Sequence, residues 1–120
     1  MGCEYYDNKL TIINKSNVPI APFIRENNSF EWTPSIDLSK VTKLGINPNE
    51  KESLDAYSSW ERTINLSPNK KIYIFFVSPD TIKKYAWDTL FKNKMYLQVD
   101  SFDLNELKEK NWEVAYIGKN

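Results

Sequence analysis

The sequence predicts an α+β domain that is mainly β, in which an antiparallel sheet or sandwich carries two short helices in its C-terminal half. Four Trp, seven Tyr and six Phe in 120 residues favour strands, because aromatic side chains pack well on a pleated surface. The run IYIFFV at residues 72–77 is apolar throughout and too short for a helix, which is typical of a central strand. Two helix starts follow it, at Ser78-Pro79 and at Asp103, which is followed by Glu106.

Strand patterns account for much of the remaining chain, at residues 9–14, 18–25, 41–46, 52–57, 95–100 and 112–117. Pro19 and Pro22 lack the amide hydrogen that a β-ladder needs, so we expect their segment at a sheet edge or in a bulge. The turn sequence NPN at residues 47–49 predicts that the strands on either side of it pair with each other. In the last strand, alternation places Trp112, Val114 and Tyr116 on one face.

The first predicted helix begins after the central strand. Ser78 is expected to cap it and Pro79 to be its first residue, where the missing amide of proline carries no penalty. Apolar residues recur at helical spacing, so one helix is expected to continue to Asn93, which can end it in the left-handed conformation. Its inner face would hold Ile82, Tyr85, Ala86, Thr89 and Leu90.

The remaining segments are shorter or less regular. Asp103 and Glu106 form a capping-box pattern, which predicts a second short helix ending near Lys110. Residues 58–62 predict a single helical turn or a tight corner, and residues 26–40 read as a long loop.

Composition argues against most catalytic classes. Sixteen basic residues balance sixteen acidic ones, so no overall field attracts nucleic acid. The sequence has no His, one Cys and three scattered Gly, which removes the usual general base, thiolate zinc sites and glycine-rich phosphate loops. We therefore expect no enzyme activity, no metal and no cofactor, although a pair of carboxylates could still act on a glycosidic bond. No stretch is long enough for a transmembrane helix.

Cys3 allows three interpretations. Myristoylation of Gly2 with palmitoylation of Cys3 would require Ser or Thr where the chain has Tyr6. An unmodified thiol on a frayed terminus is the second. The third, which we favour, is that Gly2-Cys3 is what remains of a bacterial lipoprotein signal, with a lipid on Cys3 anchoring the chain to a membrane. Residues 1–8 would then be a tether, and residues 9–120 a single β-rich domain.

The stretch KIYIFFVSPDTIKKYAWDTLFKNKMYLQVDSFDLNELKEKNWEVAYI resembles a family of small Bacteroidetes cell-envelope lipoproteins of unknown function. The shared features are an aromatic-rich strand, a D-T-[IL]…W-D-T helix, an acidic-capped short helix and a closing N-W-x-[ILV]-x-Y strand. The resemblance covers about residues 70–117 and implies an outer-membrane lipoprotein, on the periplasmic or the surface face. It implies no activity.

Six residues besides Cys3 are candidate sites. Trp32 and Trp60, with Tyr57 and Glu61 beside the latter, could stack on a sugar or anchor a protein, although burial of Trp60 in the core is the favoured interpretation. The resemblance also implies O-glycosylation at Thr81 and Thr89, which follow Asp residues in the pattern that the family's phylum uses. A structural role in the helix is favoured for both, because Thr81 lies in a first turn and Thr89 on the predicted apolar face.

Three functions remain open from the sequence. The leading one is a non-catalytic envelope lipoprotein whose surface loops bind a protein or glycan partner. The second is an immunity protein that neutralises an antibacterial toxin, since small size and one domain suit it equally. The third is a carboxylate-based glycan hydrolase.

Overall fold

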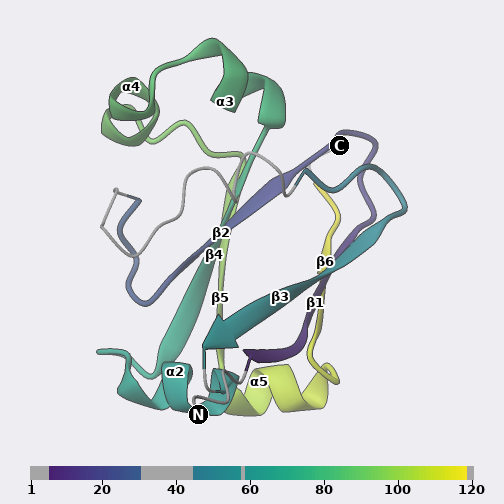
Figure 1. Cartoon of the computed structure of the whole chain (residues 1–120), viewed down its shortest axis with the longest axis vertical. Helices are drawn as coiled ribbons and strands as arrows, with labels where there is room; N and C mark the ends of the chain where they lie inside the picture. Colours follow the sequence, from purple (N-terminus) through teal and green to yellow (C-terminus); the bar gives the residue numbers. More distant parts are fainter. Residues whose placement is uncertain (1–5, 31–44, 58, 119–120) are drawn as a thin grey trace, which may run out of the picture.

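Two three-stranded sheets make up the frame of the molecule (Figure 1). The computed structural model describes residues 6–30, 45–57 and 59–118. One sheet has the order β3 (Lys51–Tyr57), β1 (Tyr6–Asn14) and β6 (Glu113–Tyr116), and the other has the order β2 (Ala21–Arg25), β4 (Lys71–Val77) and β5 (Gln98–Asp103). The predicted class, mainly β with short helices, is confirmed. Pairing is antiparallel except between β1 and β6, which run parallel.

Strand β4 lies at the centre of its sheet and is buried on both faces. Ile72, Ile74 and Phe76 belong to an apolar cluster between the two sheets, and Phe75 and Val77 belong to a second cluster on the opposite face. Successive side chains of a strand point to opposite faces, so a strand covered on both sides is apolar at every position. This explains the continuous run at residues 72–77, and the predicted central position is confirmed.

Short helices close the two clusters at opposite ends of the molecule (Figure 1). Helices α2 (Trp60–Leu66) and α5 (Leu104–Glu109) lie at the end of the first cluster, to which they contribute Trp60, Ile64 and Leu107. Helices α3 (Pro79–Lys84) and α4 (Trp87–Lys92) lie at the other end and contribute Ile82, Leu90 and Phe91 to the second cluster.

Strand β2 is an edge strand, as its prolines predicted. Within it, Pro22 lies opposite Phe76. Because Pro22 has no amide hydrogen, this pair takes a non-hydrogen-bonded position of the ladder. The β2–β4 hydrogen bonds therefore fall on the neighbouring pairs, such as Phe23 and Phe75. The backbone of Phe76 is left to face β5 on the other side.

One prediction about the first sheet is wrong. Strand β1 begins at Tyr6, so residues 6–8 belong to the sheet rather than to the predicted tether, and Asp7 is buried. Strand β3 pairs with β1, and its predicted pairing with residues 41–46 falls largely outside the described residues. Of that segment only residues 45–46 are described, and Ile46 forms an isolated bridge with Ile20. The turn at 47–49 is present, with a hydrogen bond of 3.0 Å from the Glu50 amide to the Asn47 carbonyl.

The predicted helix from Pro79 to Asn93 is two helices. Tyr85 and Ala86 are both extended and separate α3 from α4. The break changes the direction of every later side chain, so Tyr85, Ala86 and Thr89 are exposed instead of facing the core. The residue with a left-handed backbone is Lys94, with φ of 50°, and not Asn93.

The C-terminal segment follows the sequence expectations more closely. Both halves of the predicted capping box at α5 are present, with the Glu106 amide donating to Asp103 and the Asp103 amide donating to Glu106. In β6, Val114 and Tyr116 are buried side by side, as alternation predicted. Residues 58–62 predicted one helical turn, and α2 extends this to Leu66 with Ser59 as its N-cap.

The core assignment predicts that two isoleucines respond differently to the same change. Ile74→Val removes one methylene from a fully buried site and should lower the free energy of unfolding by about 1 kcal/mol. Ile117→Val makes the same change at a side chain that is 66% exposed, and should alter stability by less than about 0.5 kcal/mol. Equilibrium unfolding in urea measures both, and equal losses would contradict the assignment.

An aromatic pocket with a lysine rim

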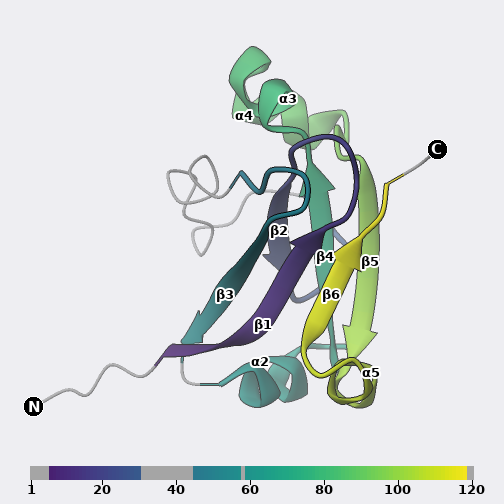
Figure 2. The same ribbon diagram turned by 90° about the vertical axis from the view of Figure 1, so that its right-hand side faces the viewer.

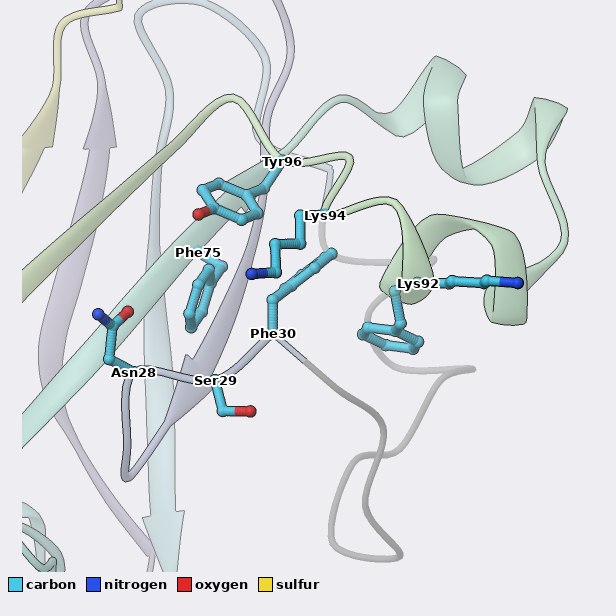
Figure 3. Close-up of a pocket in the computed structure, with 8 residues that line it drawn as sticks. Asn28, Ser29, Phe30, Phe75, Lys92, Lys94 and Tyr96 are labelled. Carbon is cyan, nitrogen blue, oxygen red and sulfur yellow. The ribbon is translucent and has the colours of Figure 1, made fainter.

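A pocket of about 430 Å³ opens on the outer face of the β2–β4–β5 sheet, beside α4 (Figure 3). Three parts of the chain form it: the loop that follows β2, the middle of β4, and α4 with the connection to β5. Its lining consists of aromatic, amide, hydroxyl and ammonium side chains from Asn28, Ser29, Phe30, Phe75, Phe91, Lys92, Lys94 and Tyr96.

The aromatic wall is a set of interlocking rings centred on Phe30. Its ring centroid lies 5.1 Å from that of Phe75, 5.1 Å from that of Tyr96 and 4.9 Å from that of Phe91. Phe75 and Tyr96 also meet edge to face, at 5.1 Å. These are favourable separations for aromatic pairs. Because Phe75 is held in the central strand, the wall rests on the most buried part of the sheet.

The pocket's backbone is fixed by local hydrogen bonds after α4. The Met95 amide donates to the Leu90 carbonyl at 3.0 Å, and the Tyr96 amide donates to the Lys94 carbonyl at 2.9 Å. On the other side, Arg25 Nε donates to the Ser29 carbonyl at 3.0 Å and holds the loop after β2. Both loops that carry lining residues are therefore tied to helix or sheet.

Within the part of the chain that the structure describes, the charged residues that line the pocket are Lys92 and Lys94, and both are basic. Lys94 extends toward the side that holds Phe30 and Phe75, whereas Lys92 points away from it (Figure 3). A flat apolar wall beside an ammonium group suits a ligand that has an apolar part and a negative charge.

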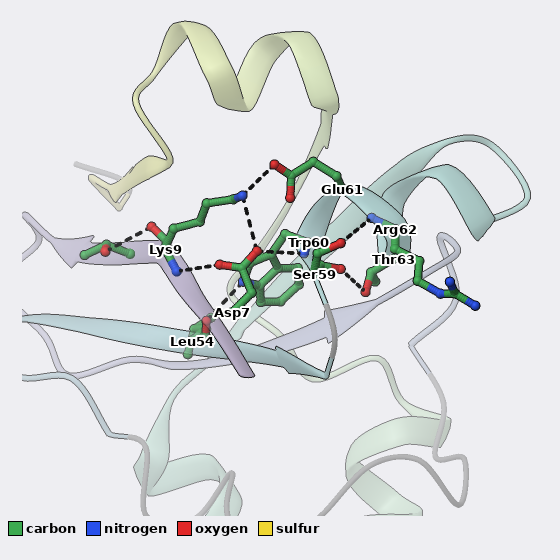
Figure 4. Close-up of polar contacts among 9 residues, drawn as sticks. Asp7, Lys9, Leu54, Ser59, Trp60, Glu61, Arg62 and Thr63 are labelled. Atoms are coloured by element: carbon green, nitrogen blue, oxygen red, sulfur yellow. Dashed lines mark hydrogen bonds and ion pairs between the residues drawn. The ribbon is translucent and has the colours of Figure 1, made fainter. Parts of the chain in front are cut away.

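A polar cluster, separate from the aromatic pocket, joins β1 to α2 (Figure 4). Lys9 Nζ lies 3.3 Å from the Asp7 carboxylate and 2.5 Å from the Glu61 carboxylate, and 4.6 Å from the centre of the Trp112 ring. The Trp60 amide donates to Asp7 at 3.0 Å. Trp60 itself is 3% exposed, and its indole N–H donates to the Leu54 carbonyl at 3.1 Å.

This cluster lowers the pKa of both acids. Burial opposes ionisation of Asp7, but the hydrogen bonds from the Trp60 amide and from Lys9 outweigh it, so the pKa of Asp7 falls below its ordinary value. The hydrogen bond from Lys9 is the largest influence on Glu61, whose pKa also falls. The pKa of Lys9 rises, because its bonds to the two acids outweigh the effect of burial.

Asp7 and Glu61 are thus a close pair of carboxylates, the arrangement that glycosidic hydrolysis would require. One of such a pair must act as an acid and needs a raised pKa, whereas both of these are lowered. Neither residue lines the aromatic pocket. The pair is better explained as an anchor for Lys9 and the first turn of α2.

The candidate residues from the sequence are therefore not brought together. Trp60 is in the core, the favoured interpretation, while the Glu61 side chain is 37% exposed and bound to Lys9. Tyr57 ends β3 and its side chain is outside the described part, as are Cys3 and Trp32. Thr81 is half-buried in α3. Thr89 is exposed, so the apolar-face argument against its glycosylation is wrong.

The sequence analysis missed the pocket because its residues come from segments far apart in the chain. A local signal did exist: Lys92 ends a helix, and Lys94 and Tyr96 follow it at alternate positions. The sequence predicts a strand that begins at residue 95, whereas β5 begins at Gln98.

Comparison of the chain with protein-family models, with curated proteins and with solved structures found no significant match. In the part of the chain that the structure describes, no helix is long and apolar enough to cross a membrane. No three His, Cys, Asp or Glu side chains of residues 6–30, 45–57 and 59–118 are grouped to hold a metal ion.

The Lys9 cluster predicts a loss of stability in acid. A carboxylate whose pKa is lower in the folded than in the unfolded chain stabilises the fold above its unfolded pKa. That contribution is lost as the pH falls through the folded value. The free energy of unfolding should therefore decrease as the pH falls below the ordinary values of 4.5 for Glu61 and 3.8 for Asp7.

The matched variant is Lys9→Met, which keeps the length of the side chain and removes its charge. Urea unfolding between about pH 6 and about pH 3 should show a shallower pH dependence in this variant than in the natural protein. Lys108→Met, an exposed lysine in α5, is the control and should leave the dependence unchanged. Identical slopes in all three proteins would contradict the assigned role of Lys9.

Proposed function

We propose that this protein is a non-catalytic binding protein of the bacterial cell envelope, which holds an acidic segment of another macromolecule in the aromatic pocket. The observation that carries the proposal is the pocket's composition: among the described residues that line it, a wall of aromatic rings stands beside two charged side chains, Lys92 and Lys94, both basic. Two surface loops, after β2 and after α4, supply most of the lining, and binding residues are commonly found on loops held by a rigid scaffold.

The chemistry of the wall favours contact with a flat or apolar group. Aromatic side chains offer large rigid surfaces that lose little conformational entropy on binding, and their faces can stack on sugar rings or on side chains. Asn28 and Ser29 add polar groups at the same opening. Lys94 then supplies the charge that selects an anionic ligand over a neutral one.

The proposed location in the envelope is supported by the sequence. Cys3 follows the small residue Gly2, as the lipidated cysteine of a bacterial lipoprotein does, and it is the only cysteine in the sequence. The sheet begins at Tyr6, so a lipid on Cys3 would place the domain close to the membrane surface.

Mass spectrometry of the protein isolated from its native organism tests the anchor. We expect Cys3 to be the amino-terminal residue and to carry lipid, because signal cleavage and acylation occur at that residue in lipoproteins. A Cys3→Ser variant should lose the lipid and appear in the soluble fraction. Native protein that retains an unmodified Met1 would overturn the proposed anchor and leave the pocket proposal standing.

Binding to two acidic probes tests the pocket: a fluorescent hexaglutamate peptide and a fluorescent oligogalacturonide. Lys94→Glu should weaken binding of the preferred probe by about tenfold or more, because it replaces an attractive charge with a repulsive one beside the rings. Lys108→Glu makes the same change of charge in α5, away from the pocket, and is the matched control.

Fluorescence anisotropy measures both variants, at low and at high salt. Preference for the peptide would indicate a protein partner, and preference for the oligosaccharide would indicate a glycan. Equal weakening by Lys94→Glu and Lys108→Glu would show a nonspecific effect of net charge. That result, or binding of neither probe, would overturn the proposal.

A further inference from the structure

The accessible groups of the aromatic pocket are mainly polar, although rings form its wall. Phe30, Phe75 and Phe91 are 7%, 1% and 9% exposed, so little of each ring is left for a ligand to cover. The described lining residues that are exposed or half-buried carry an amide, two hydroxyls and two ammonium groups, and they are Asn28, Ser29, Lys92, Lys94 and Tyr96. A ligand in this pocket therefore meets hydrogen-bonding groups above a floor of rings.

Three of these polar side chains are left for a ligand to engage. In residues 6–30, 45–57 and 59–118, the side chains of Asn28, Lys94 and Tyr96 make no hydrogen bond and no ion pair. Figure 3 shows the Asn28 amide and the Tyr96 hydroxyl on the Phe75 side of the pocket. Water solvates such groups in the free protein, so a ligand that displaces it has to supply equivalent hydrogen bonds.

The hydroxyl of Tyr96 sits on a ring that its neighbours hold in place. The ring meets those of Phe30 and Phe75 edge to face, at interplanar angles of 67° and 77°. The Tyr96 backbone is fixed as well, because its amide donates to the Lys94 carbonyl at 2.9 Å. A group that is already ordered loses little conformational freedom on binding, so this hydroxyl is preorganised to select a ligand.

Lys94 occupies a backbone position that glycine usually takes. The Met95 amide donates to the Leu90 carbonyl at 3.0 Å and the Lys94 amide to the Phe91 carbonyl at 3.2 Å, which is the Schellman arrangement at the end of α4. Within it Lys94 has a left-handed backbone, with φ of 50°. A residue with a Cβ is strained in this conformation, so glycine is the common choice. The chain has a lysine there instead, and its ammonium group extends toward the rings (Figure 3).

From this arrangement we infer that the pocket binds an acidic polysaccharide, through a sugar unit that carries one negative charge. The inference rests on the proposed function and names the class of ligand for the same pocket. The ammonium group of Lys94 points to the rings, whereas Lys92 points away (Figure 3). One positive charge beside a neutral amide and neutral hydroxyls matches a ligand with one negative charge among neutral hydroxyls.

An acidic peptide matches these groups less well. Its neutral hydrogen-bonding groups belong to the backbone, behind side chains that all carry charge, and one ammonium group points inward to receive them. The Asn28 amide and the Tyr96 hydroxyl would then lose water without gaining a partner, which is unfavourable. A sugar ring can lie across the opening instead, with its hydroxyls at Asn28 and Tyr96 and its carboxylate at Lys94.

Three fluorescent probes test the inference by anisotropy with the full chain: an oligogalacturonide, the same oligosaccharide fully methyl-esterified, and hexaglutamate. The ester keeps the sugar ring and its hydroxyls but has no charge, so it should bind about tenfold more weakly than the free acid, the effect of losing one charged hydrogen bond. Hexaglutamate should also bind more weakly than the oligogalacturonide, although it carries charge on every residue.

Two variants remove the neutral groups one at a time. Tyr96→Phe keeps the ring and deletes the hydroxyl, and Asn28→Ala deletes the amide. Each should weaken binding of the oligogalacturonide about fivefold, the effect of losing one neutral hydrogen bond, and leave binding of hexaglutamate unchanged. Tyr85→Phe and Asn105→Ala make the same changes at exposed residues that do not line the pocket, and are the matched controls.

A third variant separates binding from stability. Lys94→Gly relieves the left-handed backbone, so it should raise the melting temperature, by about 2 °C, while it weakens binding of the oligogalacturonide about tenfold. Lys70→Gly is the matched control, because Lys70 is also left-handed, with φ of 53°, and does not line the pocket. It removes the same charge and should leave binding unchanged. Circular dichroism verifies that every variant is folded.

The outcomes distinguish this inference from the proposed function. Tighter binding of hexaglutamate, with no effect of Tyr96→Phe or Asn28→Ala, would overturn the polysaccharide and leave an acidic segment of a protein as the ligand. Equal binding of the oligogalacturonide and its ester would overturn both, since no charge would then be recognised. Binding that Lys94→Gly and Lys70→Gly change equally would also overturn both, because the ligand would lie outside the pocket.

Discussion

The burial of β4 on both faces is the constraint on which the other elements depend. A strand with Ile72, Ile74 and Phe76 on one side and Phe75 and Val77 on the other cannot be stable with either face in water. One face requires the first sheet (β3–β1–β6) with α2 and α5, and the other requires α3, α4 and the ring of Phe30. The aromatic pocket is therefore the outer margin of a cluster that the fold needs in any case.

Features that are encoded locally could be predicted from the sequence. The run at residues 72–77 has no polar position, so only a central strand accommodates it. Pro22 cannot donate a ladder hydrogen bond, which restricts β2 to an edge, and Asp103 with Glu106 forms a capping box whose partners are three residues apart. In each case the physical cause lies within a few residues of the effect.

Features that depend on residues far apart in the chain could not be predicted from the sequence. Strand β3 has a plausible partner next to it in sequence, yet it pairs with β1, because the first cluster needs Leu54 opposite Leu10. The break at Tyr85 has no glycine or proline to announce it. The same holds for the polar cluster at α2. Trp60 and Glu61 could be identified as candidates from the sequence, but their contacts with Asp7 and Lys9, which lie more than fifty residues earlier, could not be predicted. The aromatic pocket is also built across such distances, from residues 28–30, 75 and 91–96.

The parallel pairing of β1 with β6 has a consequence for how the protein folds during its synthesis. Strand β1 is flanked on one side by residues 113–116, so the first sheet cannot be completed until those residues have been synthesised. Such pairing closes a very long loop and makes folding slow. Until residues 113–116 are available, β1 can pair with β3 alone, and the side of β1 that β6 covers in the folded protein stays open.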